Sequence, residues 1–119
     1  MNMTLNVNDI RIKVKVVEGG KLKAIISLDF GDFTVKGFRI QESQYETKAA
    51  GNRKLWLTPP SYADRGGRYH PIFYIPDKDL WERLEAKIWE AYDAEHKRHY
   101  AKVYDLNSDE ADQFLNSSS

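Results

Sequence analysis

Between Asp9 and Glu18, hydrophobic and polar residues alternate strictly as far as Val16. The apolar positions are Ile10, Ile12, Val14 and Val16, and the basic positions between them are Arg11, Lys13 and Lys15. A period of two is the pattern of a strand that buries one face and exposes the other. This segment is therefore predicted to be a half-buried strand with a basic outer face.

Two glycine-containing turns divide the next segment into a meander. Gly19-Gly20 follows the first strand and precedes an apolar run over residues 22–30. Glycine tolerates the positive φ that tight hairpin turns require, so this pair predicts a β-hairpin. Gly31-Asp32 predicts a second tight turn before a third strand. Gly37 interrupts that strand, which predicts a β-bulge or a close backbone approach.

The segment that follows is less regular. Residues 41–53 are polar, lack either periodicity and contain Gly51-Asn52, so they are predicted to form a mobile surface loop. A short fourth strand at residues 54–58 is expected to end at Pro59-Pro60, because proline cannot donate to a ladder. After a further excursion, residues 69–75 are predicted to form a fifth strand.

At Asp77 the period changes from two to 3.6, which predicts a long helix with Asp77 as N-cap. The helix is expected to run to about residue 104, with acidic residues near its start and basic residues near its end, as the helix dipole favours. Its apolar stripe consists of Leu80, Leu84, Ile88, Ala91 and Tyr92, widened by Trp81 and Trp89. The predicted fold is α+β, a small antiparallel meander of about five strands followed by a long C-terminal amphipathic helix.

The chain has 119 residues, enough for one core, and we expect a single domain over residues 1–104 with a polar tail over residues 105–119. It has no cysteine, which excludes disulfides, thiolate metal sites and cysteine nucleophiles. No apolar run approaches the ~18 residues of a membrane span. The expected location is the cytoplasm, with no membrane partner.

The formal net charge is zero, but the charges are segregated along the chain. Residues 1–76 hold 12 Lys and Arg against 7 Asp and Glu, a net charge of +5. Residues 77–119 hold 6 against 11, a net charge of −5. The sheet half is therefore basic and the helix half acidic, and a basic surface is the usual footprint of a nucleic-acid partner.

The histidines offer two sites of possible chemistry. His96 and His99 are spaced i, i+3 beside Glu95 and could share a metal, but no third ligand has a motif spacing, so packing is favoured and no metal is predicted. His70 could act as a base. Ser61 and Asp64 lie nearby in the chain without a nucleophile elbow or triad context, so no catalysis, cofactor or small-molecule substrate is expected.

Several motifs in order resemble a known family. The stretch VNDIRIKVKVVEGGKLKAIISLDFGDFTVKGFRI, then LWLTPPS and RYHPI, resembles the SpoVG family of bacteria, the stage V sporulation protein G or septation-regulator family, over roughly residues 7–92. The resemblance implies a small antiparallel sheet with a C-terminal helix and a homodimer. It also implies binding of DNA and RNA in the control of gene expression, septation and sporulation, without catalysis.

We therefore hypothesise that basic strand faces and adjoining loops contact phosphates, which position a nucleic acid without specifying its sequence. The predicted contacts are Arg11, Lys13, Lys15, Lys21, Lys23, Lys36, Arg39, Arg53, Lys54, Arg65 and Arg68. A second candidate surface on the helix consists of Lys97, Arg98, His99 and Lys102.

The alternative function is a non-catalytic structural or protein-interaction dimer. In that case the acidic helix, with an exposed Trp81 or Trp89, would dock another protein, and the basic strands would only protect a sheet edge. The zero net charge favours this alternative.

Overall fold

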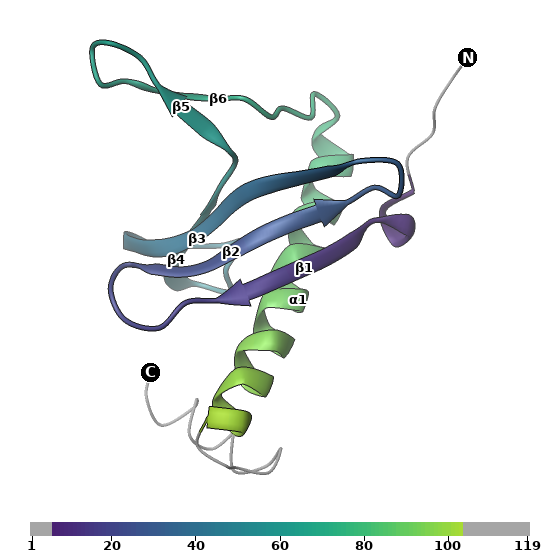
Figure 1. Cartoon of the computed structure of the whole chain (residues 1–119), viewed down its shortest axis with the longest axis vertical. Helices are drawn as coiled ribbons and strands as arrows, with labels where there is room; N and C mark the ends of the chain where they lie inside the picture. The colour runs from purple at the N-terminus through teal and green to yellow at the C-terminus, as the bar shows by residue number, and fades with distance from the viewer. Residues whose placement is uncertain (1–5, 104–119) are drawn as a thin grey trace.

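The computed structural model describes residues 6–103, and its centre is an antiparallel sheet in the order β1-β2-β3-β4 (Figure 1). The strands are β1 (Arg11–Val16), β2 (Leu22–Asp29), β3 (Thr34–Thr47) and β4 (Arg53–Thr58), and a 3₁₀ turn, η1 (Val7–Asp9), precedes them. The sheet order follows the chain order, so the predicted meander is confirmed.

Gly37 forms the bulge that its place in the sequence predicts. Ser27 pairs with Lys36 and Ile26 pairs with Phe38, which leaves Gly37 as an extra residue in β3. Its φ is +101°, a conformation that residues with a side chain rarely adopt. A Cβ at this position would lie 3.5 Å from Cβ of Pro60, so the glycine also marks a close approach between β3 and the chain after β4.

The loop predicted over residues 41–53 is wrong for its first part. β3 continues to Thr47, and only the turn over residues 48–52 separates it from β4. Gln41 pairs with Trp56 and Glu42 with Leu55, so the neighbouring strand supplies backbone hydrogen bonds to a polar segment. Pairing with β4 thus forms a strand in a segment whose polar side chains show no alternation of hydrophobic and polar residues.

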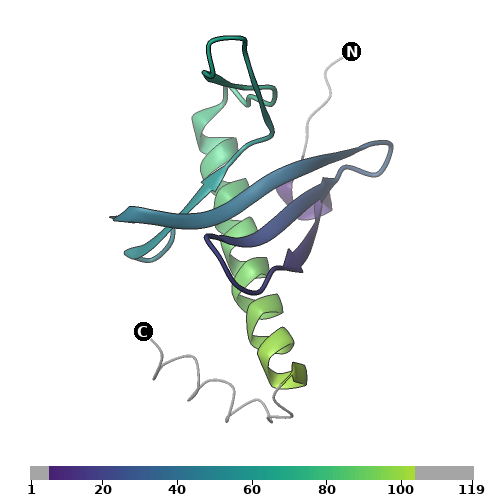
Figure 2. The ribbon, with the colours of Figure 1, turned by 60° about the vertical axis from the view of Figure 1, so that its left-hand side comes forward.

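The fifth predicted strand is shorter than expected and does not join the main sheet. Two short strands, β5 (Ser61–Ala63) and β6 (Tyr69–Pro71), pair with each other in a separate hairpin. We call residues 61–71 the arm; it extends away from the main sheet (Figures 1 and 2). Prolines at positions 59, 60 and 71 cannot donate to a ladder, which explains why this segment leaves the sheet.

The helix α1 (Lys78–Val103) crosses one face of the sheet (Figure 2). Asp77 Oδ1 accepts a hydrogen bond of 3.1 Å from the Leu80 backbone N–H, so the predicted N-cap is confirmed. No helix within residues 6–103 is long and apolar enough to cross a membrane.

The core lies between α1 and the inward faces of β2 and β3. The predicted helix stripe is confirmed at its centre, because Leu84, Ile88 and Tyr92 are buried, whereas Leu80 and Ala91 are partly buried. Its partners are alternate residues of the strands, as a period of two requires. The buried strand residues are Ala24, Ile26, Leu28, Phe38 and Ile40.

Candidate nucleic-acid interface

The sheet face opposite α1 carries rows of basic side chains that the strand register aligns. On β1, Arg11, Lys13 and Lys15 are exposed and alternate with residues that pack on the core. Lys13 pairs with Ser27, which pairs in turn with Lys36. The next row runs from Lys15 through Ile25 to Arg39 and Thr58. We call this surface the open face.

The fourth strand extends the open face with a cation and an aromatic ring. Leu55 and Leu57 pack against the core, so Lys54 and Trp56 point to the opposite side. Trp56 pairs with Gln41 of β3, and 48% of its surface is exposed. The alternation in KLWLT contains the signal for this placement, although our sequence prediction did not include Trp56.

Lys23 does not lie on the open face. A register shift between Leu22 and Ala24 makes Lys23 the extra residue of a second bulge. Its Nζ lies 3.1 Å from Oε1 of Glu42, and its positive charge acts on His96 of α1. The bulge therefore turns Lys23 toward the helix side, where an ion pair already engages it.

Arg53 also faces the helix. Its Nε donates to the Ala50 carbonyl over 2.7 Å, and its guanidinium lies 2.9 Å from Oδ1 of Asp93. The guanidinium carbon lies 5.6 Å from the ring centroid of Trp89 and 6.0 Å from that of Tyr92. Arg53 thus tethers the start of β4 to α1 through an ion pair and cation–π contacts.

The remaining predicted cations lie apart from the open face. Lys21 is exposed at the end of the β1–β2 turn, and Arg65 and Arg68 are exposed on the arm. The structure therefore brings six of the eleven predicted side chains onto one face and distributes the other five. The six are Arg11, Lys13, Lys15, Lys36, Arg39 and Lys54.

A hollow of about 520 Å³ adjoins the open face where the chain passes from β4 into the arm. Arg39, Gln41, Trp56 and Thr58 line it from the sheet, and Ser61 and Tyr69 line it from the arm. Its size falls within the ~300–1,000 Å³ of typical ligand pockets. Tyr69 is 75% exposed, so both aromatic rings at this hollow have free surface.

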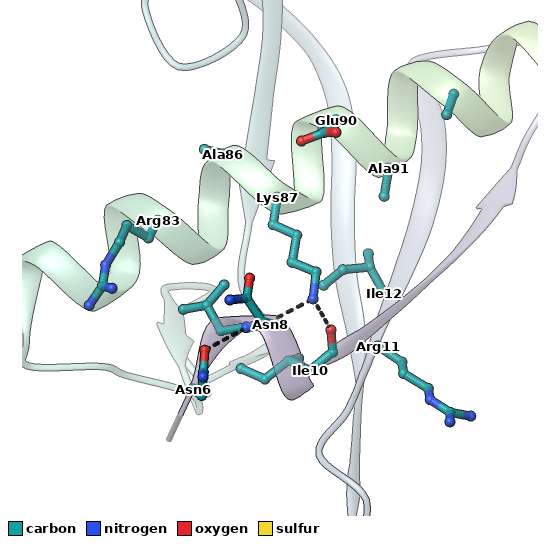
Figure 3. Close-up of a pocket in the computed structure, with 12 residues that line it drawn as sticks. Asn6, Asn8, Ile10, Arg11, Ile12, Arg83, Ala86, Lys87, Glu90 and Ala91 are labelled. Carbon is teal, nitrogen blue, oxygen red and sulfur yellow. Dashed lines mark hydrogen bonds between the residues drawn. The ribbon is translucent and has the colours of Figure 1, made fainter. Parts of the chain in front are cut away.

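A larger hollow of about 890 Å³ lies between η1, β1 and α1 (Figure 3). Lys87 reaches from the helix into it and donates to the backbone carbonyls of Val7, over 2.7 Å, and Ile10. Because the ammonium group already satisfies two carbonyls, this lysine holds the N-terminal segment onto the helix.

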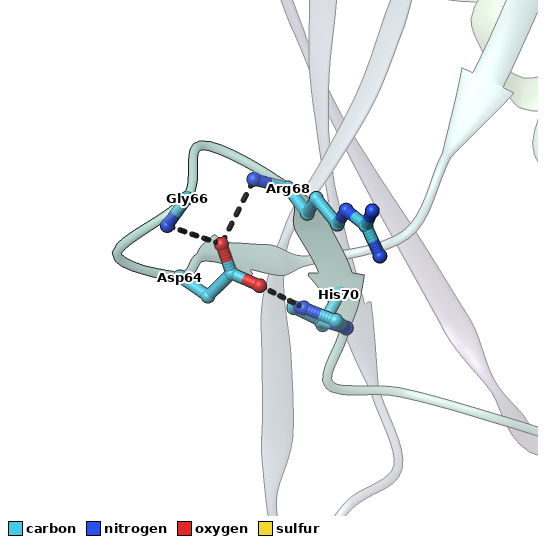
Figure 4. A network of polar contacts seen from close by, with 4 residues as sticks. All are labelled: Asp64, Gly66, Arg68 and His70. Atoms are coloured by element: carbon cyan, nitrogen blue, oxygen red, sulfur yellow. Dashed lines mark hydrogen bonds and ion pairs between the residues drawn. The ribbon is translucent and has the colours of Figure 1, made fainter.

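The arm contains a contact between Asp64 and His70 that the sequence did not predict. Asp64 Oδ2 lies 2.8 Å from Nε2 of His70, and Oδ1 accepts hydrogen bonds from the Gly66 and Arg68 backbone N–H groups (Figure 4). The hydrogen bond with His70, followed by the one from Arg68, lowers the pKa of Asp64. Both carboxylate oxygens are thus used to hold the turn, which is a structural role.

The helix histidines are held by aromatic and polar neighbours. The His96 ring stacks on Tyr92 at a centroid distance of 5.3 Å and meets Tyr100 edge-on at 4.7 Å. His99 Nε2 lies 2.9 Å from Oε1 of Glu18 in the β1–β2 turn. Burial lowers the pKa of His96 and raises the pKa of Tyr92 to about 12. Within residues 6–103, no three His, Cys, Asp or Glu side chains are grouped as metal ligands.

The alternative function requires an exposed Trp81 or Trp89, whereas both tryptophans widen the apolar stripe of α1 as the helical period predicts. Trp89 is only 4% exposed. Trp81 packs against the core, and its ring centroid lies 6.4 Å from the ring centroid of Phe38. Both side chains extend the apolar stripe toward the sheet, and most of each is covered, because Trp89 is buried and Trp81 is partly buried. The one tryptophan that is largely accessible is Trp56 on the open face.

Comparison with known proteins identifies the family. No family model matches the chain. The chain is 31% identical over 90 residues to a protein of Desulforudis audaxviator (strain MP104C) named "Putative septation protein SpoVG". The match covers 75% of this chain and 92% of the relative. Identity at this level over most of both chains, together with the antiparallel sheet and C-terminal helix, shows that the protein belongs to the SpoVG family.

Proposed function

We propose that this protein is a nucleic-acid-binding regulator that acts as a homodimer, in the control of gene expression, septation or sporulation. The observation that supports the proposal best is the alignment of six cationic side chains on the sheet face opposite α1. Lys13 and Lys15 are two residues apart, roughly 7 Å, and Lys36 lies two strands from Lys13, roughly 10 Å. Such a grid can contact several phosphates at once.

Few acidic groups oppose the cations of this surface. Asp29 lies in the row of Arg11, and its Oδ1 accepts a hydrogen bond of 2.9 Å from the Gly31 backbone N–H. The acidic residues of α1 lie on the other side of the sheet. Segregation of charge thus gives a locally basic surface on a molecule without net charge, and local potential is what attracts a polyanion.

Self-association is supported by exposed hydrophobic side chains on and near the arm. Tyr62, Ile72 and Tyr74 are 54%, 65% and 80% exposed. Exposed apolar side chains favour contact with another protein surface. A second copy of the chain would cover it and would double the basic footprint. Size-exclusion chromatography with light scattering at micromolar concentration tests this part, and a monomer would contradict it.

Charge reversal tests the assignment of the binding surface. The variant K13E/K15E/K36E removes three cations of the open face, and K97E/R98E/K102E makes the same charge change on α1. Binding to labelled duplex DNA and single-stranded RNA would be followed by fluorescence anisotropy at several salt concentrations. We expect the sheet variant to lose most of its affinity and the helix variant to lose much less.

Equal binding by both variants and the unmodified protein would reject both surfaces. A larger loss in the helix variant would move the interface to α1, where Arg98 donates to Glu95 and His99 contacts Glu18. Failure of the unmodified protein to bind either probe at low salt would favour the protein-interaction alternative.

A further inference from the structure

The hollow between the open face and the arm combines two accessible aromatic rings with polar and cationic groups. Trp56 and Tyr69 line it from opposite elements, and Arg39, Gln41, Thr58 and Ser61 supply its polar atoms. We propose that this hollow binds an unpaired base of a single-stranded nucleic acid, stacked on Trp56 and flanked by Tyr69. This inference rests on the proposed function and names its preferred substrate.

Strand geometry directs both rings to this place. Trp56 lies on the open face by alternation with Leu55 and Leu57. In the arm, Ala63 pairs with Tyr69, and Tyr62 pairs with His70. Successive residues of a strand face opposite sides, so Tyr69 faces the hollow while Tyr62 and His70 stack on the far side, with ring centroids 5.2 Å apart.

The base of the arm lies against the sheet. Pro60 is buried and meets the bulge at Gly37. Its carbonyl accepts a hydrogen bond of 2.8 Å from the Ile72 N–H, which joins the two ends of the arm. A preformed hollow lowers the entropic cost of binding, because fewer side chains and less backbone must be ordered when the ligand enters.

The lining favours a nucleobase over an apolar peptide. Among the described residues that line the hollow, none is acidic and Arg39 is cationic. The amide of Gln41 can donate to and accept from the edge of a base, and aromatic rings stack on any base. Lys36 and Lys54 lie beside the hollow on the same face and can contact the flanking phosphates.

Access to the base distinguishes single strands from duplexes. In a duplex the base faces are already stacked on their neighbours, so insertion would require unpairing and unstacking. In a single strand the base can leave its neighbours at low cost. The open face therefore binds phosphates of either form, while the hollow adds affinity only for unpaired bases.

The experiment compares three labelled probes of equal length: a single-stranded oligonucleotide, an abasic strand with the same sugar-phosphate backbone, and a duplex. Anisotropy titrations would use the full chain with Trp56→Ala, Tyr69→Ala, the conservative Trp56→Phe, and the matched control Tyr45→Ala. Tyr45 is 76% exposed and does not line the hollow. Thermal unfolding would show whether each variant folds.

We expect the unmodified protein to bind the single strand more tightly than the abasic strand. Trp56→Ala should weaken single-strand binding by roughly 5- to 150-fold, the usual loss for one stacked base. The same variant should leave abasic-strand binding unchanged, and Trp56→Phe and Tyr45→Ala should bind normally.

Equal loss on the single strand and the abasic strand, or no loss at all, would overturn the stacking site. Tighter binding of the duplex than of the single strand by the unmodified protein would overturn it too. In each of these cases the basic open face could still bind phosphates, as K13E/K15E/K36E would show. Failure of the unmodified protein to bind any probe at low salt would instead reject the proposed function itself.

Discussion

Gly37 has a backbone conformation that no other residue adopts without strain. Its φ of +101° lies outside the regions open to residues with a Cβ. The same residue forms the bulge that resets the register of β3 and lets Pro60 approach. A single position thus shapes both the open face and the base of the arm.

The strain at this position predicts a stability change. Gly37→Ala should reduce the free energy of unfolding by about 1–3 kcal/mol, the cost of a residue held in a sparsely populated conformation. The new Cβ would contact Pro60 at an ordinary distance of 3.5 Å, so the backbone and not a clash causes the loss. Urea denaturation measures the change, with Thr34→Ala on the exposed start of β3 as control. Equal stability of both variants would contradict the strained bulge.

Lys87 is a charged side chain with a structural role. It donates from α1 to two carbonyls at the N-terminal end of the sheet, more than seventy positions earlier in the chain. Hydrogen bonds from a charged donor contribute more than neutral ones. The side chain thus fixes the start of β1, and with it Arg11.

Replacement of Lys87 by methionine keeps the aliphatic stem and removes the donor. Lys87→Met should reduce the free energy of unfolding by about 1.5–3 kcal/mol, because two partly buried carbonyls lose a charged partner. Lys78→Met, at an exposed position in the first turn of α1, is the matched control and should change stability little. Chemical denaturation of both variants would decide, and a stable Lys87→Met would show that water replaces the ammonium group.

At the scale of elements, the C-terminal half of α1 carries a row of packed aromatic rings and contacts the β1–β2 turn through His99. His96 is half-buried between Tyr92 and Tyr100, and His99 contacts Glu18. Burial is the largest cause that lowers the pKa of His96 below its ordinary value of 6.5, and the nearby charge of Asp93 opposes it. The folded helix therefore favours the neutral imidazole.

This pKa shift gives a pH dependence of stability with a definite sign. As the pH falls through 6.5, the unfolded chain binds a proton at His96 before the folded chain does. The contribution of the neutral ring is therefore complete above 6.5 and decreases as the pH falls toward the pKa of the folded state. His96→Phe keeps an aromatic ring and should be less sensitive to acid than the unmodified protein. Thermal unfolding at pH 7.5 and 5 measures the difference, and identical pH profiles would contradict it.

At the scale of the whole molecule, the two sides of the main sheet carry opposite charge. The open face has cations on three strands, and the other side of the sheet is covered by a helix rich in carboxylates. Two predicted cations are already engaged on the helix side, Lys23 with Glu42 and Arg53 with Asp93. The number of cations free to contact phosphates is thus smaller than the sequence suggests.

The count of open-face cations predicts the salt dependence of duplex binding. Each phosphate that is neutralised contributes about −0.9 to the slope of log affinity against log salt concentration. The six cations set a limit of about −5 per protomer, and if Lys23 and Arg53 also bound, the slope would be steeper. Anisotropy titrations over a salt series measure this slope. Affinity independent of salt would refute electrostatic binding.

The sequence alone determined the α+β class, the first three strands, the core stripe of α1 and its N-cap, because period and capping chemistry are local. Only the tertiary structure decided where the charges lie. The bulge at Lys23 and the cation–π contacts of Arg53 move two predicted cations to the helix side, and neither effect follows from local spacing. Pairing with β4 extends β3 through a polar segment, and the arm brings Tyr69 to the hollow that contains Trp56. Contacts between residues far apart in the chain depend on register and packing, which no local pattern encodes.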